Sequence, residues 1–81
     1  MRKNSMVLAY VFINVKRGGE LSAEKLKSLK GVMDMSLVYG EYDIIMKVNK
    51  ESMEDLQNFL VKELRPLGFI EKTSTMIVVQ K

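Results

Sequence analysis

The chain has 81 residues, 47% of them hydrophobic, with a net charge of +3 and neither cysteine nor histidine. Disulfides are excluded, and so are the zinc, haem and iron–sulfur sites that rely on these two residue types. A single domain of this size buries only about 60% of its extended-chain surface, so its core gives marginal stability. We therefore expect no cofactor and no metal, and we expect copies of the chain to associate and cover apolar surface.

The first predicted element is a strand over residues 6–15, an apolar run rich in β-branched and aromatic side chains. Residues 1–5 are expected to be a disordered start, so that 6–81 form a single domain. The run is far shorter than the ~20 residues of a membrane-spanning helix, and no signal-peptide cleavage site follows it, which favours a cytoplasmic protein. Because Tyr10 and Phe12 make its second face apolar too, the strand is predicted to be central or to meet a partner.

Two helices are predicted, one over residues 21–30 and one over 51–65. Ser22 and Ser52 are expected as their N-caps, because a serine hydroxyl can accept a hydrogen bond from a free N–H of the first turn. Pro66 ends the second helix. The apolar residues of that helix recur at the spacing of one helix face, namely Met53, Leu56, Phe59, Leu60 and Leu64.

Three further strands are predicted over residues 32–39, 41–49 and 69–80, where apolar and polar residues alternate. The first two are joined at Gly40 into a hairpin. The element order is then βαββαβ, which with right-handed crossovers gives the ferredoxin-like α+β fold. Its four-stranded antiparallel sheet carries two helices on one face, with the last strand paired to the first and the first to the third.

The second face of this predicted sheet is left to solvent or to another copy, which would make a dimeric α/β sandwich. We expect Glu41 and Asp43 on that face, and Thr73 and Thr75 with them. Strict alternation along the last strand places Ile70 on the opposite side from the threonines. A polar strip among aliphatic side chains is therefore predicted where two copies would meet.

The turn between the hairpin strands is the most informative stretch of the chain. Hydrogen-bonding and aromatic side chains crowd around its glycine: Tyr39, Gly40, Glu41, Tyr42 and Asp43. Glu41 and Asp43 are two apart, so both carboxylates lie on one face, where they could accept an ammonium group or form a weak metal site. The alternative is a solvated strand start, and catalysis is disfavoured because paired carboxylates need further partners.

A second polar stretch, Thr73-Ser74-Thr75, places three hydroxyl groups in a row near the start of the last strand. Hydroxyls both donate and accept hydrogen bonds, which suits a small zwitterionic ligand. The alternative is that threonine simply favours strands. In this topology the stretch is no direct neighbour of the Gly40 turn within one subunit, so the two would have to meet across a subunit contact.

Several other functions are disfavoured by what the sequence lacks. No phosphate loop, dinucleotide fingerprint or nucleophile–base pair is present. Tyr42 is the single aromatic of the third predicted strand, which disfavours base stacking of the RNA-recognition kind. Ferredoxin-like enzymes need a histidine, a cofactor or an arginine–asparagine pair, and only Arg17 and Asn14 lie near each other. The chain is therefore not expected to be an enzyme or to bind nucleic acid directly.

Segments 9–15, 31–32, 38–43 and 73–75 together resemble the effector-binding (RAM) domain of the Lrp/AsnC regulators, over about residues 6–80. The most specific element is Gly40-Glu41-Tyr42-Asp43 followed by an aliphatic strand. In that family the domains dimerise through their sheet faces, and the dimers assemble into rings. The resemblance is compatible with a ring of eight or of ten subunits. The helix-turn-helix domain of full-length members is not expected, because only five residues precede the first strand.

The resemblance implies that an amino acid binds near this turn, at the contact between dimers. Gly40, Glu41, Tyr42 and Asp43 would be ligand contacts beside Tyr39. The candidates from the same or a neighbouring subunit are Thr73, Ser74 and Thr75. The leading hypothesis is a stand-alone amino-acid-sensing module that modulates full-length Lrp/AsnC regulators. A ligand-free assembly module is the first alternative, and a small ferredoxin-like enzyme the second.

Overall fold

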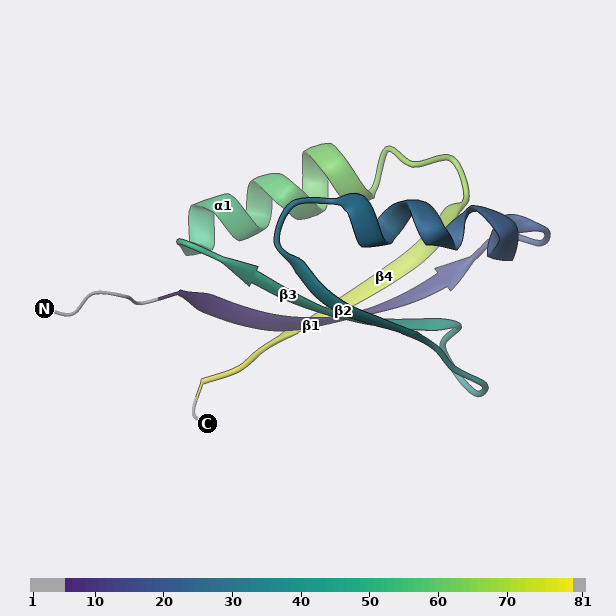
Figure 1. The fold of residues 1–81 in the computed structure, drawn as a ribbon, viewed down its shortest axis with the longest axis horizontal. Coiled ribbons are helices and arrows are strands. Elements are labelled where there is room, and N and C mark those ends of the chain that lie inside the picture. Colours follow the sequence, from purple (N-terminus) through teal and green to yellow (C-terminus); the bar gives the residue numbers. More distant parts are fainter. Residues whose placement is uncertain (1–5, 80–81) are drawn as a thin grey trace, which may run out of the picture.

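The computed structural model describes residues 6–79, which form a four-stranded sheet covered on one face by helices (Figure 1). The strands are β1 (Val7–Val15), β2 (Val32–Leu37), β3 (Ile44–Lys50) and β4 (Ile70–Ile77). The helical layer holds the 3-10 helix η1 (Gly19–Ser28) and α1 (Met53–Asn58), which continues as the π-helix η2 (Phe59–Leu64). The predicted disordered start (residues 1–5) and the end of the predicted last strand (Gln80) lie outside the described residues.

The sheet has the order β2-β3-β1-β4, and every neighbouring pair is antiparallel. This is the ferredoxin-like arrangement, and the predicted fold class and strand pairing are confirmed. Side chains of β1 alternate as predicted, with Ala9, Val11 and Ile13 completely buried under the helices and Tyr10 exposed on the other side. A strand paired on both sides and buried on one face carries the centre of the core.

Antiparallel partners share a face of the sheet, and this overturns one prediction about β4. Thr73 is opposite Ile13 and Thr75 is opposite Val11, so both threonines lie on the helix-covered face. They were expected on the opposite face. The register between β1 and β4 also shifts at residues 14–15, which places Ile70 opposite Val15 and buries it. A β-bulge of this kind breaks the strict alternation on which the prediction rested.

The two helical segments differ from the predicted regular helices in instructive ways. The first begins at Gly19 as a 3-10 helix with Gly18 (φ +84°) as its N-cap, so Ser22 lies inside the helix and is not its cap. Ser52 does cap the second, because its hydroxyl accepts the Asp55 N–H at 3.0 Å. That helix then widens to π geometry, and it ends at Leu64, before Pro66 as predicted.

The π turn explains how the second helix buries its largest side chain. Phe59 and Leu64 are both completely buried although they are five residues apart, a spacing that an α-helix would not place on one line. The Arg65 N–H donates to the Leu60 carbonyl at 3.1 Å, the i→i−5 bond of a π-helix. The widened turn therefore aligns two core residues.

Replacing Phe59 by alanine should lower the free energy of unfolding by about 3–5 kcal/mol, because it removes a buried ring and leaves a cavity. Urea denaturation followed by circular dichroism measures this loss. Val61→Ala in the same helix is the matched control, since Val61 is 54% exposed and should change little. Equal losses in the two variants would contradict the assignment of Phe59 to the core.

Candidate ligand-binding turn

The connection between β2 and β3, residues 38–43, projects at one end of the sheet (Figure 1). It is longer than the tight turn predicted, because β2 already ends at Leu37 and β3 begins only at Ile44. The Val38 N–H donates to the Asp43 carbonyl at 2.9 Å and closes the loop. Gly40 has φ +152°, a conformation that residues with a side chain rarely adopt. The connection is thus a wider loop with an exposed tip.

Asp43 fastens this loop to the central strand. Its Oδ2 accepts the backbone N–H of Val15 at 2.9 Å, just beyond the point where the β1–β3 pairing ends at Ile13 and Ile44. The Asp43 N–H in turn donates to the Ile13 carbonyl at 2.9 Å. A buried backbone N–H needs an acceptor, and the carboxylate supplies one where β3 turns away. Asp43 therefore has a structural role that the sequence pattern did not predict.

Asn14 makes a second connection to the same loop. Its Nδ2 donates to the Glu41 carbonyl at 3.0 Å and approaches Asp43 Oδ2 at 3.4 Å. From the sequence, Asn14 stood out only beside Arg17, as a possible enzymatic pair. The signal that could have found it is an amide side chain between Ile13 and Val15, in a strand that is otherwise apolar, since half-buried amides require partners.

The two tyrosines of the loop have different surroundings. The Tyr42 ring lies against Phe12 of β1, with centroids 5.5 Å apart and planes tilted by 54°. Such tilted aromatic contacts are favourable and hold the ring in place. Tyr39 at the tip is fully exposed, and Gly40 and Glu41 beside it are exposed as well. Within one subunit, the loop is anchored through Tyr42 and Asp43 and presents Tyr39, Gly40 and Glu41 to the outside.

The hydroxyl residues of β4 are separated from this loop by β1, as the topology predicted. Of the three, only Ser74 is opposite Phe12 and shares the face that the helices leave uncovered. Thr73 and Thr75 are half-buried on the helix side. One subunit therefore does not bring the two predicted polar stretches together, and their joint contact with a ligand stays a prediction.

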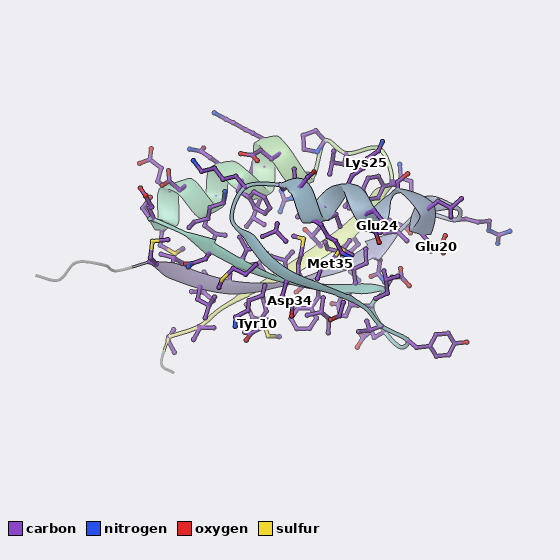
Figure 2. All side chains as sticks on the ribbon, in the orientation of Figure 1. Tyr10, Glu20, Glu24, Lys25, Asp34 and Met35 are labelled. Carbon is purple, nitrogen blue, oxygen red and sulfur yellow. The ribbon has the colours of Figure 1, made fainter. Side chains whose placement is uncertain are left out.

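The face of the sheet opposite the helices, called the open face here, carries both apolar and polar side chains. Its apolar members include Leu8, Tyr10, Phe12, Ile45 and Met76. Its polar members include Asp34, Ser36, Lys47 and Ser74. Figure 2 shows Tyr10 projecting from the sheet on the side away from the helices. Tyr10 and Met76 are exposed, whereas Phe12 and Ile45 are half-buried. Exposed apolar side chains with polar ones around them are typical of a surface that contacts another protein chain.

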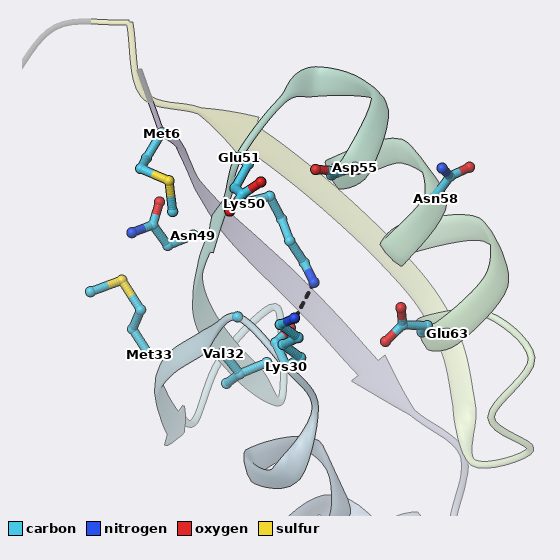
Figure 3. A pocket seen from close by; sticks show the side chains of 11 residues that line it. Met6, Lys30, Val32, Met33, Asn49, Lys50, Glu51, Asp55, Asn58 and Glu63 are labelled. Atoms are coloured by element: carbon cyan, nitrogen blue, oxygen red, sulfur yellow. Dashed lines mark hydrogen bonds between the residues drawn. The ribbon is translucent and has the colours of Figure 1, made fainter. Parts of the chain in front are cut away.

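A cavity of about 580 Å³ lies away from the loop, between the end of η1 and α1 (Figure 3). Lys50 reaches across it, donating from Nζ to the Lys30 carbonyl at 2.7 Å and lying 4.6 Å from the centre of the Phe59 ring. The Lys50 ammonium therefore satisfies a backbone carbonyl just after the end of η1. Asn49 also lines the cavity, with a buried Oδ1 that has no partner among the described residues. None of the predicted site residues lines it.

Two kinds of feature are absent from residues 6–79. No three Asp or Glu side chains gather there closely enough to hold a metal ion, so Glu41 and Asp43 form no such group. No helix in this part of the chain is both long and apolar enough to cross a membrane.

Comparison with known proteins decides which family this fold and loop represent. The family model of the Lrp/AsnC ligand binding domain matches residues 8–81, nearly the whole chain. The chain belongs to the Lrp/AsnC family. The resemblance of the Gly40 loop and its neighbouring strands to that family is thereby confirmed, and the 81 residues contain its ligand-binding domain.

Individual Lrp/AsnC relatives agree with this assignment. The HTH-type transcriptional regulator FL11 of Pyrococcus furiosus is 32% identical over 91% of this chain and 49% of its own length. The solved structure of Escherichia coli AsnC is 30% identical, with a TM-score of 0.85 over 93% of this chain and 52% of that one. The solved structure of FFRP-DM1 is 36% identical, with a TM-score of 0.87 over 90% and 99%. The chain spans about half the length of FL11 and AsnC.

Asp43→Ala should lower the free energy of unfolding by about 1–3 kcal/mol, because it leaves the buried Val15 N–H without an acceptor. Asp43→Asn keeps a side-chain oxygen at that place and should cost clearly less. Urea denaturation of both variants measures the difference. If both variants lose equally little free energy of unfolding, the carboxylate does not support the strand end.

Proposed function

We propose that this chain is an amino-acid-sensing regulatory module that binds its effector at contacts between copies of itself. The observation that carries the proposal is the exposed, firmly anchored loop of residues 39–43 in a domain whose family is defined by ligand binding. A rigid scaffold that presents polar groups on a loop is the usual arrangement of a binding site.

The chemistry of the loop suits an α-amino acid, which carries a cation and an anion on one carbon. The Glu41 carboxylate is exposed, and among the described residues it makes no ion pair within 4.0 Å, so it can receive the ammonium group. Asp43 adds a second negative charge nearby. Backbone N–H groups around Gly40 can hold the carboxylate, as turn amides often hold anions. Each charge-assisted bond contributes ~1.5–3 kcal/mol, so affinities near the micromolar range are expected after the ordering costs.

A single copy supplies only one side of such a site. Tyr39, Gly40 and Glu41 are exposed, and the cavity of about 580 Å³ contains none of them. The second side has to come from another subunit, to which Ser74, Thr73 and Thr75 are the proposed contributors. Association through the open face would bring copies together, and dimers could then assemble into a ring. The chain would affect transcription by assembling together with full-length Lrp/AsnC regulators.

Isothermal titration calorimetry against the twenty amino acids tests the sensor proposal. One solved neighbour, a transcriptional regulator of Neisseria meningitidis, is a complex with L-Met. At 15% identity the likeness extends to the fold alone, but it makes L-Met a sensible first probe. Glu41→Gln should weaken binding at least about tenfold, because it removes one charge-assisted bond. Absence of binding by all twenty would refute the sensor and favour a ligand-free assembly module.

Ile45→Lys should convert the assembly to smaller species, because it places a charge beside Phe12 on the open face. Light scattering measures the mass, and Val61→Lys is the matched control on the exposed surface of η2. The variant should also bind amino acids poorly, since a site shared between copies is lost on dissociation. An unchanged mass would show that the copies meet through another surface, and monomers with undiminished affinity would show that the site lies within one chain.

A further inference from the structure

We propose that Asn14 is the positioning residue of the loop: its side-chain amide turns the peptide group between Glu41 and Tyr42 so that the Tyr42 N–H faces the ligand. This rests on the proposed function, because it names the backbone donor that receives the carboxylate of the bound amino acid. Asn14 itself does not touch the ligand and acts through the loop backbone.

The side-chain amide of Asn14 has two N–H hydrogens that can be donated. Asn14 Nδ2 donates to the Glu41 carbonyl at 3.0 Å, and its approach to Asp43 Oδ2 at 3.4 Å is the weaker contact. Asn14 is half-buried on β1 and is opposite Lys72 of β4, while the pairing of β1 with β3 ends one residue earlier, at Ile13. The donor is therefore fixed to the most constrained strand of the sheet, while its acceptors belong to a projecting loop.

The consequence for the loop follows from the planarity of the peptide bond. In a trans peptide the C=O and the following N–H point in opposite directions, and no cis peptide occurs among the described residues. Because the Glu41 carbonyl points toward Asn14, the Tyr42 N–H points away from β1. That N–H has no hydrogen-bond acceptor within the described residues, so a donor beside the exposed Glu41 is left free for an anion.

The other hydrogen bonds of the loop among the described residues do not involve this peptide group. Val38 N–H to the Asp43 carbonyl closes the base, and Asp43 is tied to Ile13 and Val15. The contact of the Tyr42 ring with Phe12 involves the side chain and supplies no hydrogen bond to this peptide group. Gly40 adds backbone freedom directly before Glu41. Among residues 6–79, the Asn14 amide is the group that holds the Glu41 carbonyl.

Asn14→Asp is the sharpest test. At about pH 7.5 the new carboxylate would face Asp43 and the Glu41 carbonyl, so repulsion should turn the peptide and raise the Kd for the amino acid about 10- to 100-fold. At about pH 5, acid raises the protonated fraction of the new carboxyl group, and a protonated carboxyl O–H can donate to the Glu41 carbonyl as the amide did. Calorimetry should then show the Kd returning toward the wild-type value measured at the same pH.

Asn58→Asp on α1 is the matched control, since it changes the net charge equally at an exposed position away from the loop. It should bind like the wild type at both pH values. A wild-type Kd for Asn14→Asp at about pH 7.5 would overturn the proposal. So would a loss shared by the control, or a loss that acid does not reverse in a folded variant.

Amide NMR of the wild-type protein keeps the proposal testable if the variant does not fold. The Asn14 side-chain NH₂ should exchange slowly, and the Tyr42 amide signal should shift most among loop residues when the amino acid is added. Rapid exchange of that NH₂ would overturn the proposal. If the wild type binds no amino acid, the sensor fails first, and the slow or rapid exchange of Asn14 still decides whether it positions the loop.

Discussion

Hydrogen bonding of β1 on both of its edges is the constraint on which the rest of the domain depends. Its core face, with Ala9, Val11 and Ile13 completely buried, receives the helices, and its edges set the register of β3 and β4. The same strand then fastens the loop of residues 38–43 through Asn14 and Val15. A central strand in a domain this small thus supports stability and the candidate site together.

This arrangement explains why a projecting loop can serve as a binding site. A loop without internal packing has to become ordered when a ligand binds, and this entropic cost lowers the affinity for the ligand. Here the Asp43 carboxylate accepts the Val15 N–H, and the Tyr42 ring packs on Phe12. Part of the loop is therefore already ordered before a ligand binds. The groups that remain exposed at the tip, Glu41 and the backbone near Gly40, are those with charge and hydrogen-bonding capacity for an amino acid.

Sequence patterns predicted the helices and strands well where burial alternates regularly. They failed where the strand register is irregular. The alternation along β1 and the cap at Ser52 were correctly predicted, because each depends on local geometry. The placement of Thr73 and Thr75 was wrong, since the face of β4 is determined by its partners on β1. The bulge beside Val15 puts Ile70 on the same face as the threonines, from which strict alternation had separated it, and the π turn below Phe59 left no mark on the helical spacing.

The sequence by itself determined the order of elements, the central strand and the family, since apolar periodicity and the Gly40-Glu41-Tyr42-Asp43 motif are local properties of the chain. Tertiary structure alone decided what Asp43 and Asn14 do. Their partners lie 27 to 29 residues away in the chain, and a carboxylate that looks free for a ligand proves to be engaged with a backbone N–H. Hydrogen bonds between distant segments depend on strand register, which no local pattern encodes.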